Sequence, residues 1–263
     1  MQPTRHEQAL IKLPNRLTAV KQVLGILWKP DSEWNKMTNL VSRMYSKNGR
    51  KHPDIEGSTV RFYSQTVFPA LCDLFMRQPA LSKERLGLLR NAWGEILEIG
   101  FGTGLNLAHY PKAVRRITAV DPNVGMHAKA KRRIARARID VVHFVLSSER
   151  LPFEDGTFDC VVSTWTLCSI QDVKQALREV HRVLRTGGRF LFLEHGQSPE
   201  PGVQKWQRRL NWLQMRLADG CRLDRNIKEL VSAQPYASLE MSEYYLGDQP
   251  RTHGYMYRGV ATK

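Results

Sequence analysis

The chain has 263 residues, 42% of them hydrophobic, and its 40 Lys and Arg against 25 Asp and Glu give a net charge of +15. A chain of this length and composition can bury a large core and fits one α/β domain with appendages. No stretch approaches the ~20 apolar residues of a membrane span, and the N-terminus lacks the apolar core of a secretory signal, so we expect neither.

The excess of basic residues is heaviest in residues 1–90. Such a bias suggests an anionic partner, namely nucleic acid, an anionic membrane surface or an acidic protein. A basic surface without a dedicated partner explains the charge equally well.

We predict that residues 1–90 form a helical arm or lid. Apolar residues recur at helical spacing in 17–28, in 34–45 and in 60–76. Packing against the rest of the chain is the favoured interpretation, although a basic amphipathic helix also suits a membrane surface. The first 28 residues are basic and poor in acids, so we expect a cytoplasmic or organellar protein, mitochondria included, and a peripheral association with a membrane is compatible with this charge.

Residues 95–104, EILEIGFGTG, predict a buried parallel strand followed by a tight glycine turn and the start of a helix. The glycines Gly100, Gly102 and Gly104 let a ligand approach the backbone closely. A dinucleotide-binding turn would place its third glycine one residue later. Glu98, at the end of the strand, repels phosphate and favours a cationic ligand.

Strands and helices then alternate from residue 91 to the end, which is typical of a parallel sheet with helices on both faces. We predict strands at 95–99, 116–121, 141–146, 158–163 and 189–194, and helices near 104–110, 123–138, 172–184 and 201–218. Two further strands, at 238–246 and 255–262, would close the sheet as an antiparallel hairpin. The predicted fold class is α/β, with a Rossmann-like, mostly parallel, seven-stranded sheet.

Two of the predicted helices have a marked pattern. The run KAKRRIARAR at 129–138 is strongly cationic but has no interleaved aromatic residues, so a solvated helix face is favoured over a nucleic-acid contact. In the helix after Pro199, the apolar residues are predicted to face the core; they are Trp206, Leu210, Leu213 and Leu217.

Three further segments carry a family resemblance. They are ITAVDPN at 117–123, LPFEDGTFDCVVSTWTLCSI at 151–170 and ALREVHRVLRTGGRFLFLEHG at 176–196. With the glycine turn, they resemble in type, order and spacing the signature segments of class I S-adenosylmethionine-dependent methyltransferases of the type 11 group, over residues 92–196. The tail segments ADGCRLDR at 218–225 and HGYMYRGVATK at 253–263 resemble the methyltransferase-like enzymes that methylate alkyl thiols.

The resemblance implies S-adenosyl-L-methionine as cofactor. The glycine turn and Glu98 would lie at its methionyl end, and Asp121 would accept hydrogen bonds from the ribose hydroxyls. The remaining residues implied for the cofactor are Pro122, Ser148, Glu149 and Thr164. Ser147 stands where the family pattern has an acid, so the adenine amine would bond Ser147, a backbone carbonyl or water.

The resemblance also places Trp165 and Thr166 on the side where the methyl group emerges, so they are the predicted substrate-binding residues. Methyl transfer depends mostly on proximity and alignment, and a base is needed only for an acceptor that is protonated. His195 follows the fifth strand and is the candidate catalytic base. The alternative is a structural histidine that bonds the backbone of the turn.

The four cysteines, Cys72, Cys160, Cys168 and Cys221, form no C-x-x-C pair and have no zinc-site spacing. Buried free thiols are the simplest interpretation, and no metal site is predicted.

Three functions remain open. The first is methyl transfer to a small, apolar or lipid-like thiol, hydroxyl or amine. The second is an RNA- or ribosome-associated methyltransferase, favoured by the charge but not by STWT at 163–166, where an N/D-P-P-Y/F/W motif would stand. The third is a non-catalytic assembly factor that keeps the fold.

Overall fold

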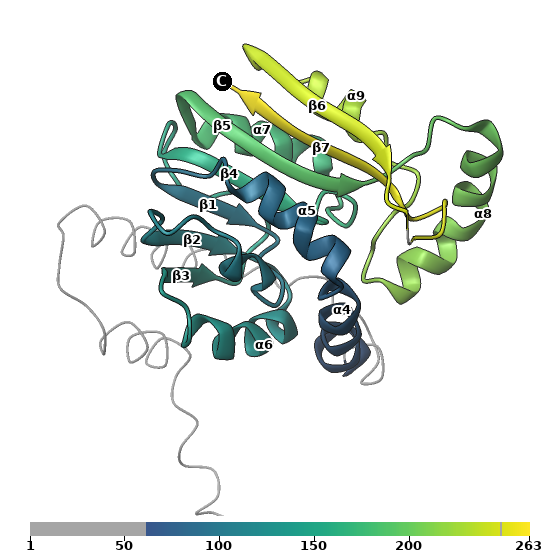
Figure 1. The fold of residues 1–263 in the computed structure, drawn as a ribbon, viewed down its shortest axis with the longest axis horizontal. Coiled ribbons are helices and arrows are strands. Elements are labelled where there is room, and N and C mark those ends of the chain that lie inside the picture. The colour runs from purple at the N-terminus through teal and green to yellow at the C-terminus, as the bar shows by residue number, and fades with distance from the viewer. Residues whose placement is uncertain (1–61, 248) are drawn as a thin grey trace, which may run out of the picture. The chain divides into compact units, whose positions relative to one another are not determined.

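A computed structural model describes residues 62–247 and 249–263 of the chain. Seven strands form one sheet in the order β3-β2-β1-β4-β5-β7-β6 (Figure 1). The strands are β1 (Ile96–Ile99), β2 (Arg116–Val120), β3 (Asp140–Phe144), β4 (Phe158–Thr164), β5 (Leu184–His195), β6 (Ser238–Tyr245) and β7 (Tyr255–Thr262). The first five run parallel, whereas β7 is antiparallel to both β5 and β6. The predicted fold class is thus confirmed.

The central strands are largely buried, as the short apolar runs predicted. All four residues of β1 are buried, and β4 is buried at most of its positions. The register pairs Ile99 with both Val120 of β2 and Ser163 of β4. The carboxyl ends of these three strands therefore lie side by side at one edge of the sheet.

Helices lie on both faces of the sheet: α5 crosses in front of it in Figure 1, and α7 lies behind it. The helical elements are η2 (Tyr63–Val67), α4 (Phe68–Met76), α5 (Pro79–Leu89), η3 (Leu105–Ala108), α6 (Val124–Ile134), α7 (Val173–Val183), α8 (Pro201–Leu217) and α9 (Ile227–Ser232). The best example of an amphipathic helix is α7, which buries Val173, Ala176, Leu177, Val180 and Val183. Asp172 caps its first turn by accepting a hydrogen bond from the Gln175 amide.

Most predicted boundaries are close to the observed ones, but β5 begins at Leu184, five residues before its predicted start. Three further differences concern helices. The helix after the glycine turn is only a short 3₁₀ segment. The helix predicted to run to residue 138 ends at Ile134, because the chain turns at 135–136. Two helices, α5 and α9, were not predicted. Residues 79–89 were assigned to the arm, but α5 packs against β5, and its residues Leu88 and Leu89 belong to the buried core.

The prediction that the apolar residues of α8 face the core is wrong. Trp206, Leu213 and Leu217 are exposed, and the buried residues of this helix are Gln207 and Asn211. The two amides are buried because they satisfy backbone groups of the adjoining loops. Gln207 donates to the carbonyls of residues 196 and 252 and accepts from the amide of residue 198, and Asn211 accepts from the amide of residue 223.

The helices predicted at 17–28 and 34–45 lie outside the described residues. Of the segment predicted at 60–76, residues 63–76 form the π-helical turn η2 and the helix α4. No helix in the described part of the chain is long and apolar enough to cross a membrane.

Candidate functional site

The glycine turn joins β1 to η3 at the carboxyl edge of the sheet. Gly100, Gly102 and Gly104 all have positive φ, between 56° and 78°. A Cβ on Gly100 would lie 2.0 Å from the Thr166 hydroxyl, so this turn passes directly under the loop after β4. A Cβ on Gly102 would meet nothing closer than 3.9 Å, so the turn is open to a ligand at that point. The backbone path therefore requires glycine, and Gly102 faces accessible space.

Glu98 is almost completely buried at the end of β1. Its two carboxylate oxygens accept hydrogen bonds from Asn106 Nδ2, at 2.9 Å, and from the Tyr110 hydroxyl, at 2.7 Å. Burial raises the pKa of Glu98 to about 7, although both hydrogen bonds oppose the shift. The site therefore contains a buried carboxylate that a nearby cation would stabilise.

Asp121 follows β2 at the same edge, where its two oxygens orient the backbone around it. One accepts a hydrogen bond from the Gly102 amide and the other from the Asn123 amide, each at 2.8 Å. Burial raises the pKa of Asp121 to about 6, and these two amides oppose the shift. Each oxygen keeps a second lone pair for a ligand.

The loop after β4 closes the site on its other side. The Thr164 hydroxyl accepts a second bond from Asn106 Nδ2, at 3.0 Å, which links it to the Glu98 cluster. Trp165 has a positive φ of 51°, and the guanidinium of Arg85 lies 4.6 Å from the centre of its ring. The cation–π contact stabilises this strained conformation, which holds the indole at the edge of the site.

Glu194, next to the end of β5, holds the same loop in place through hydrogen bonds. It is fully buried and accepts hydrogen bonds from the Ser163 hydroxyl and from the amides of Thr166 and Leu167. Burial raises its pKa to about 7, against the effect of these donors. No motif in the sequence distinguishes Glu194, although it is the residue before the predicted base, His195.

Comparison with known proteins agrees with this geometry. Residues 97–192 match the family model described as a methyltransferase domain. Over these residues the chain is similar to the class I S-adenosylmethionine-dependent methyltransferases.

A thiol S-methyltransferase of Rattus norvegicus is 36% identical over 145 residues, which cover 53% of this chain and 59% of the relative. A thiol S-methyltransferase of Homo sapiens is 35% identical over 150 residues, covering 56% and 61%. This chain thus spans about three-fifths of the length of these curated relatives. The fold also matches phosphoethanolamine N-methyltransferase 2 of Haemonchus contortus in complex with S-adenosyl-L-methionine, at a TM-score of 0.59 and 15% identity over 81% of this chain and 61% of that one.

At the predicted adenine end of the site, the structure shows no shared hydrogen bond among the described residues Pro122, Ser148 and Glu149. Ser148 is buried, whereas Pro122 is exposed. Glu149 accepts a hydrogen bond from the Asp172 amide at the start of α7, at 2.8 Å, so one of its oxygens supports that helix. The structure thus brings Glu98, the glycines, Asp121 and Thr164 together, and the adenine contacts stay a prediction.

Residues far apart in sequence meet beside Asp121, where the ribose is predicted to bind. Asn123 caps α6 and donates to the Ser64 carbonyl and to Asp219, which also accepts a bond from the Ser64 hydroxyl. A Cβ on Gly125 would lie 2.0 Å from the Gln65 carbonyl, so η2 packs directly on the first turn of α6. The signal for Asp219 was present in the tail segment 218–225, but its partner Ser64 has no recognisable pattern.

A buried carboxylate anchors α4 next to the glycine turn. Asp73 accepts hydrogen bonds from Arg133, at 2.7 Å, from the Thr103 hydroxyl, at 2.5 Å, and from Arg77. Burial alone would raise its pKa, but these three donors lower it to about 2. The cluster joins α4, α6 and the glycine turn, so α4 is part of the folded domain.

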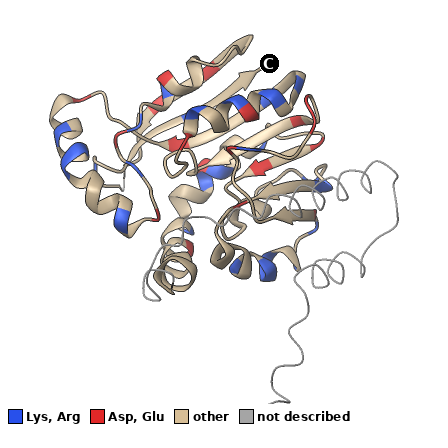
Figure 2. Cartoon of the chain, turned by 180° about the vertical axis from the view of Figure 1, so that it is seen from behind, with Lys and Arg blue, Asp and Glu red and all other residues tan. Residues whose placement is uncertain are grey.

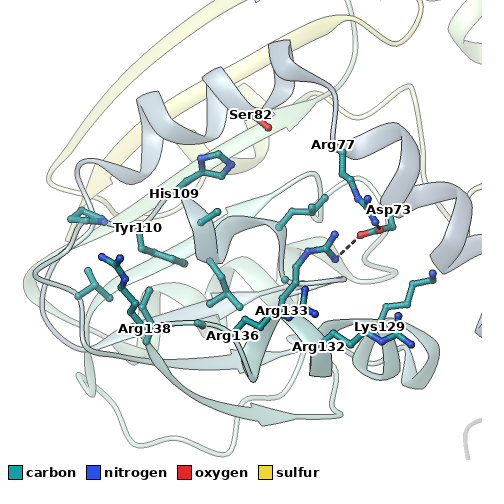
Figure 3. Close-up of a pocket in the computed structure, with 18 of the residues that line it drawn as sticks. Asp73, Arg77, Ser82, His109, Tyr110, Lys129, Arg132, Arg133, Arg136 and Arg138 are labelled. Atoms are coloured by element: carbon teal, nitrogen blue, oxygen red, sulfur yellow. Dashed lines mark hydrogen bonds and ion pairs between the residues drawn. The ribbon is translucent and has the colours of Figure 1, made fainter.

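A basic groove of about 1420 Å³ lies behind this anchor, between η3, α6 and the chain around α4 (Figure 3). Lys129, Arg132, Arg136 and Arg138 line it, and within the described residues none of them has an ion-pair partner. Figure 2 shows basic residues on α6 and along α8. The cationic run at 129–138 is therefore one wall of a groove as well as a helix face.

His195, the predicted base, lies at the carboxyl end of β5 and is buried. Its Nε2 is 3.1 Å from Cys221 Sγ, and Cys221 Sγ is 3.5 Å from Cys168 Sγ. The contact with Cys168 lowers the pKa of Cys221; burial opposes this effect and His195 adds to it. Both cysteines are free and buried, as predicted, but Nε2 of His195 faces a protein thiol. Proton abstraction from an acceptor by His195 stays a prediction.

Proposed function

We propose that this protein transfers the methyl group of S-adenosyl-L-methionine to the thiol of a small, apolar molecule. The observation that carries the proposal is the meeting of Glu98, the glycine turn and Asp121 at one edge of the sheet. An open α/β sheet binds its ligands at this carboxyl edge.

Each part of the site suits one part of the cofactor. The methionyl end has a cationic ammonium and lies beside a cationic sulfonium, and both favour the ionised form of Glu98. The ribose hydroxyls bond the free lone pairs of Asp121, whose position is fixed by two backbone amides. The turn at Gly102 leaves room for the methionyl backbone.

The choice of a thiol acceptor rests on the two thiol S-methyltransferase relatives and on chemistry. A thiol is far more acidic than an alcohol, so a larger fraction of it is ionised at neutral pH and its methylation needs alignment more than a strong base. The indole of Trp165, held beside Thr166 on the methyl side, offers an apolar surface for the body of such an acceptor.

The test is methyl transfer from labelled cofactor to a panel of small thiols, phenols, amines and RNA. Product from alkyl or aryl thiols, at rates well above those for the other classes, supports the proposal. The matched control is Asp121→Ala, which should lose turnover at low cofactor concentration. Cofactor binding without transfer to any acceptor would favour the non-catalytic assembly factor.

The basic groove favours a second candidate, an acceptor or partner that is a polyanion. Arg132, Arg136 and Arg138 are available to bind phosphates, and such binding weakens steeply with salt. Charge reversal of these three residues should abolish a salt-dependent shift on RNA but leave thiol methylation unchanged. RNA methylation that is lost in the same variant would establish the second candidate in place of the first.

A further inference from the structure

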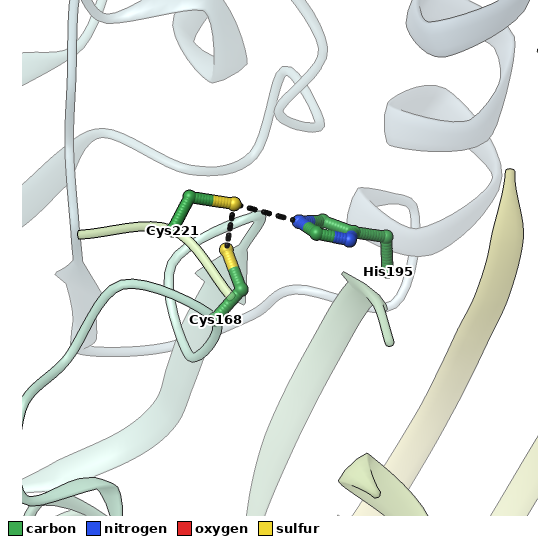
Figure 4. A group of neighbouring side chains, drawn as sticks. All are labelled: Cys168, His195 and Cys221. Atoms are coloured by element: carbon green, nitrogen blue, oxygen red, sulfur yellow. Dashed lines mark hydrogen bonds between the residues drawn. The ribbon is translucent and has the colours of Figure 1, made fainter. Parts of the chain in front are cut away.

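Three potential metal ligands from separate parts of the chain meet beside the methyltransferase site (Figure 4). Cys168 belongs to the loop after β4, His195 ends β5, and Cys221 follows α8. Their ligand atoms all lie within 4.8 Å of one another, and all three residues are buried. None of these three side chains takes part in the hydrogen bonds that position Glu98 and Asp121.

We propose that Cys168, His195 and Cys221 bind a zinc-like divalent cation, with the fourth position open to a ligand from outside the cluster. In a tetrahedral zinc site, the bond lengths imply separations of about 3.8 Å between two sulfurs and about 3.6 Å between sulfur and nitrogen. The sulfurs here are 3.5 Å apart, and His195 Nε2 is 3.1 Å from Cys221. To complete this geometry, these two separations must widen by about 0.3–0.5 Å, and the Cys168–His195 separation, which is at most 4.8 Å, must come near 3.6 Å.

The chemistry of the three ligands selects the ion. Two thiolates and one imidazole favour zinc over magnesium or calcium, which prefer oxygen ligands. Three protein ligands with one open position are typical of catalytic zinc sites, whereas structural sites use four. Nδ1 of His195 has no hydrogen-bond partner among the described residues, so this site lacks the support that most zinc-bound histidines receive. We therefore expect weaker binding than in a closed structural site.

The place of the cluster suggests what fills the fourth position. Cys168 follows Trp165 and Thr166, and His195 follows Glu194, which supports the same loop. If the acceptor is a thiol, which rests on the proposed function, its sulfur would bind the ion directly. A thiol bound to zinc would release its proton to solvent at neutral pH, so the ion would hold the acceptor as a nucleophilic thiolate without a protein base.

Cobalt titration of the reduced, full-length protein tests the ion site. Thiolate ligands give Co²⁺ an intense charge-transfer absorption, which zinc should then remove by displacing the cobalt. Cys168→Ala and Cys221→Ala should each weaken binding by more than roughly 100-fold, beyond the loss expected for a missing hydrogen-bond partner of a ligand. The matched control is Cys160→Ala, which removes a buried thiol of β4 that lies outside the cluster. Thermal melts establish that each variant is folded.

Absence of the charge-transfer band overturns the proposal, as does a band that persists in folded Cys168→Ala and Cys221→Ala proteins. A disulfide between these cysteines, found by mass spectrometry together with no cobalt binding after reduction, would identify a redox pair in place of a metal site.

The open position is tested separately by adding benzyl mercaptan to the cobalt-loaded protein without cofactor. A shift of the cobalt spectrum supports a vacant coordination position, and an unchanged spectrum overturns it. If the spectrum shifts but no thiol is methylated, the ion site stands and the proposed function fails.

Discussion

Glu98→Gln is the most informative single substitution, because it removes a buried charge while keeping the shape of the side chain. The difference between the ordinary glutamate pKa of 4.5 and the value of about 7 in the folded protein corresponds to about 3 kcal/mol. A raised carboxyl pKa means that the folded state binds the proton more tightly than the unfolded state. The wild-type protein therefore loses stability as the pH rises from about 4.5 to about 7, and the full penalty remains above that range.

The variant carries no such charge, so its free energy of unfolding should not show this decrease between about pH 4.5 and about pH 7. The glutamine can still accept from Asn106 but loses a charge-assisted bond with Tyr110, which adds an offset that does not vary with pH across this window. The free energy of unfolding of the variant, minus that of the wild type, should thus increase by about 3 kcal/mol between about pH 4.5 and about pH 8. Urea denaturation of the cofactor-free proteins across this range measures the difference.

The affinity of the wild-type protein for the cofactor should change with pH in the opposite direction to its stability. A cationic ligand beside Glu98 lowers its pKa, so wild-type affinity should rise with pH through about 7. Calorimetry on both proteins gives the ratio of their affinities, in which the titration of Asp121 and of the cofactor itself cancels. Two parallel stability curves, together with an affinity ratio that does not change with pH, would refute the assignment of Glu98 as a buried, cation-seeking carboxylate.

Three further substitutions test the rest of the site. Asp121→Ala should weaken cofactor binding by roughly 1.5–3 kcal/mol for each ribose hydrogen bond lost, and calorimetry showing equal affinities would remove Asp121 from the site. Asp73→Asn breaks a buried ion pair and should lower the free energy of unfolding by roughly 3–5 kcal/mol; a loss below about 1 kcal/mol would mean that α4 is not anchored there. Gly100→Ala puts a Cβ 2.0 Å from Thr166 at positive φ, so melting temperature and cofactor affinity should both fall, whereas Gly202→Ala, whose Cβ would meet nothing within 4 Å, should leave both unchanged.

Local patterns in the sequence determined most of the sheet and the cofactor end of the site. The apolar run of β1 and the glycines after it specify a buried strand and a tight turn through short-range sterics alone. Asp121 was predicted from the family resemblance, and it lies at the edge of the sheet where the carboxyl ends of the parallel strands meet. The spacing of apolar residues in α7 is likewise enough to predict which of its faces is buried.

The orientation of α8 shows where such patterns fail. Its stripe of apolar residues predicts burial by periodicity, yet Gln207 and Asn211 face the protein. The loops they contact expose backbone amides and carbonyls that need partners, and this need arises only once those loops are folded around the helix. Periodicity identifies two different faces of a helix, but the neighbouring elements decide which one is buried.

Tertiary structure alone also decided which side chains meet in the interior. Glu98 finds its partners 8 and 12 residues further along the chain, whereas Cys168 and Cys221 approach each other across 53 residues. Their spacing in the sequence resembles no metal motif, because the three ligands come from separate places in the fold: the loop after β4, the end of β5 and the chain after α8. Strand order and loop path bring them together, and neither is encoded in the spacing of the residues themselves.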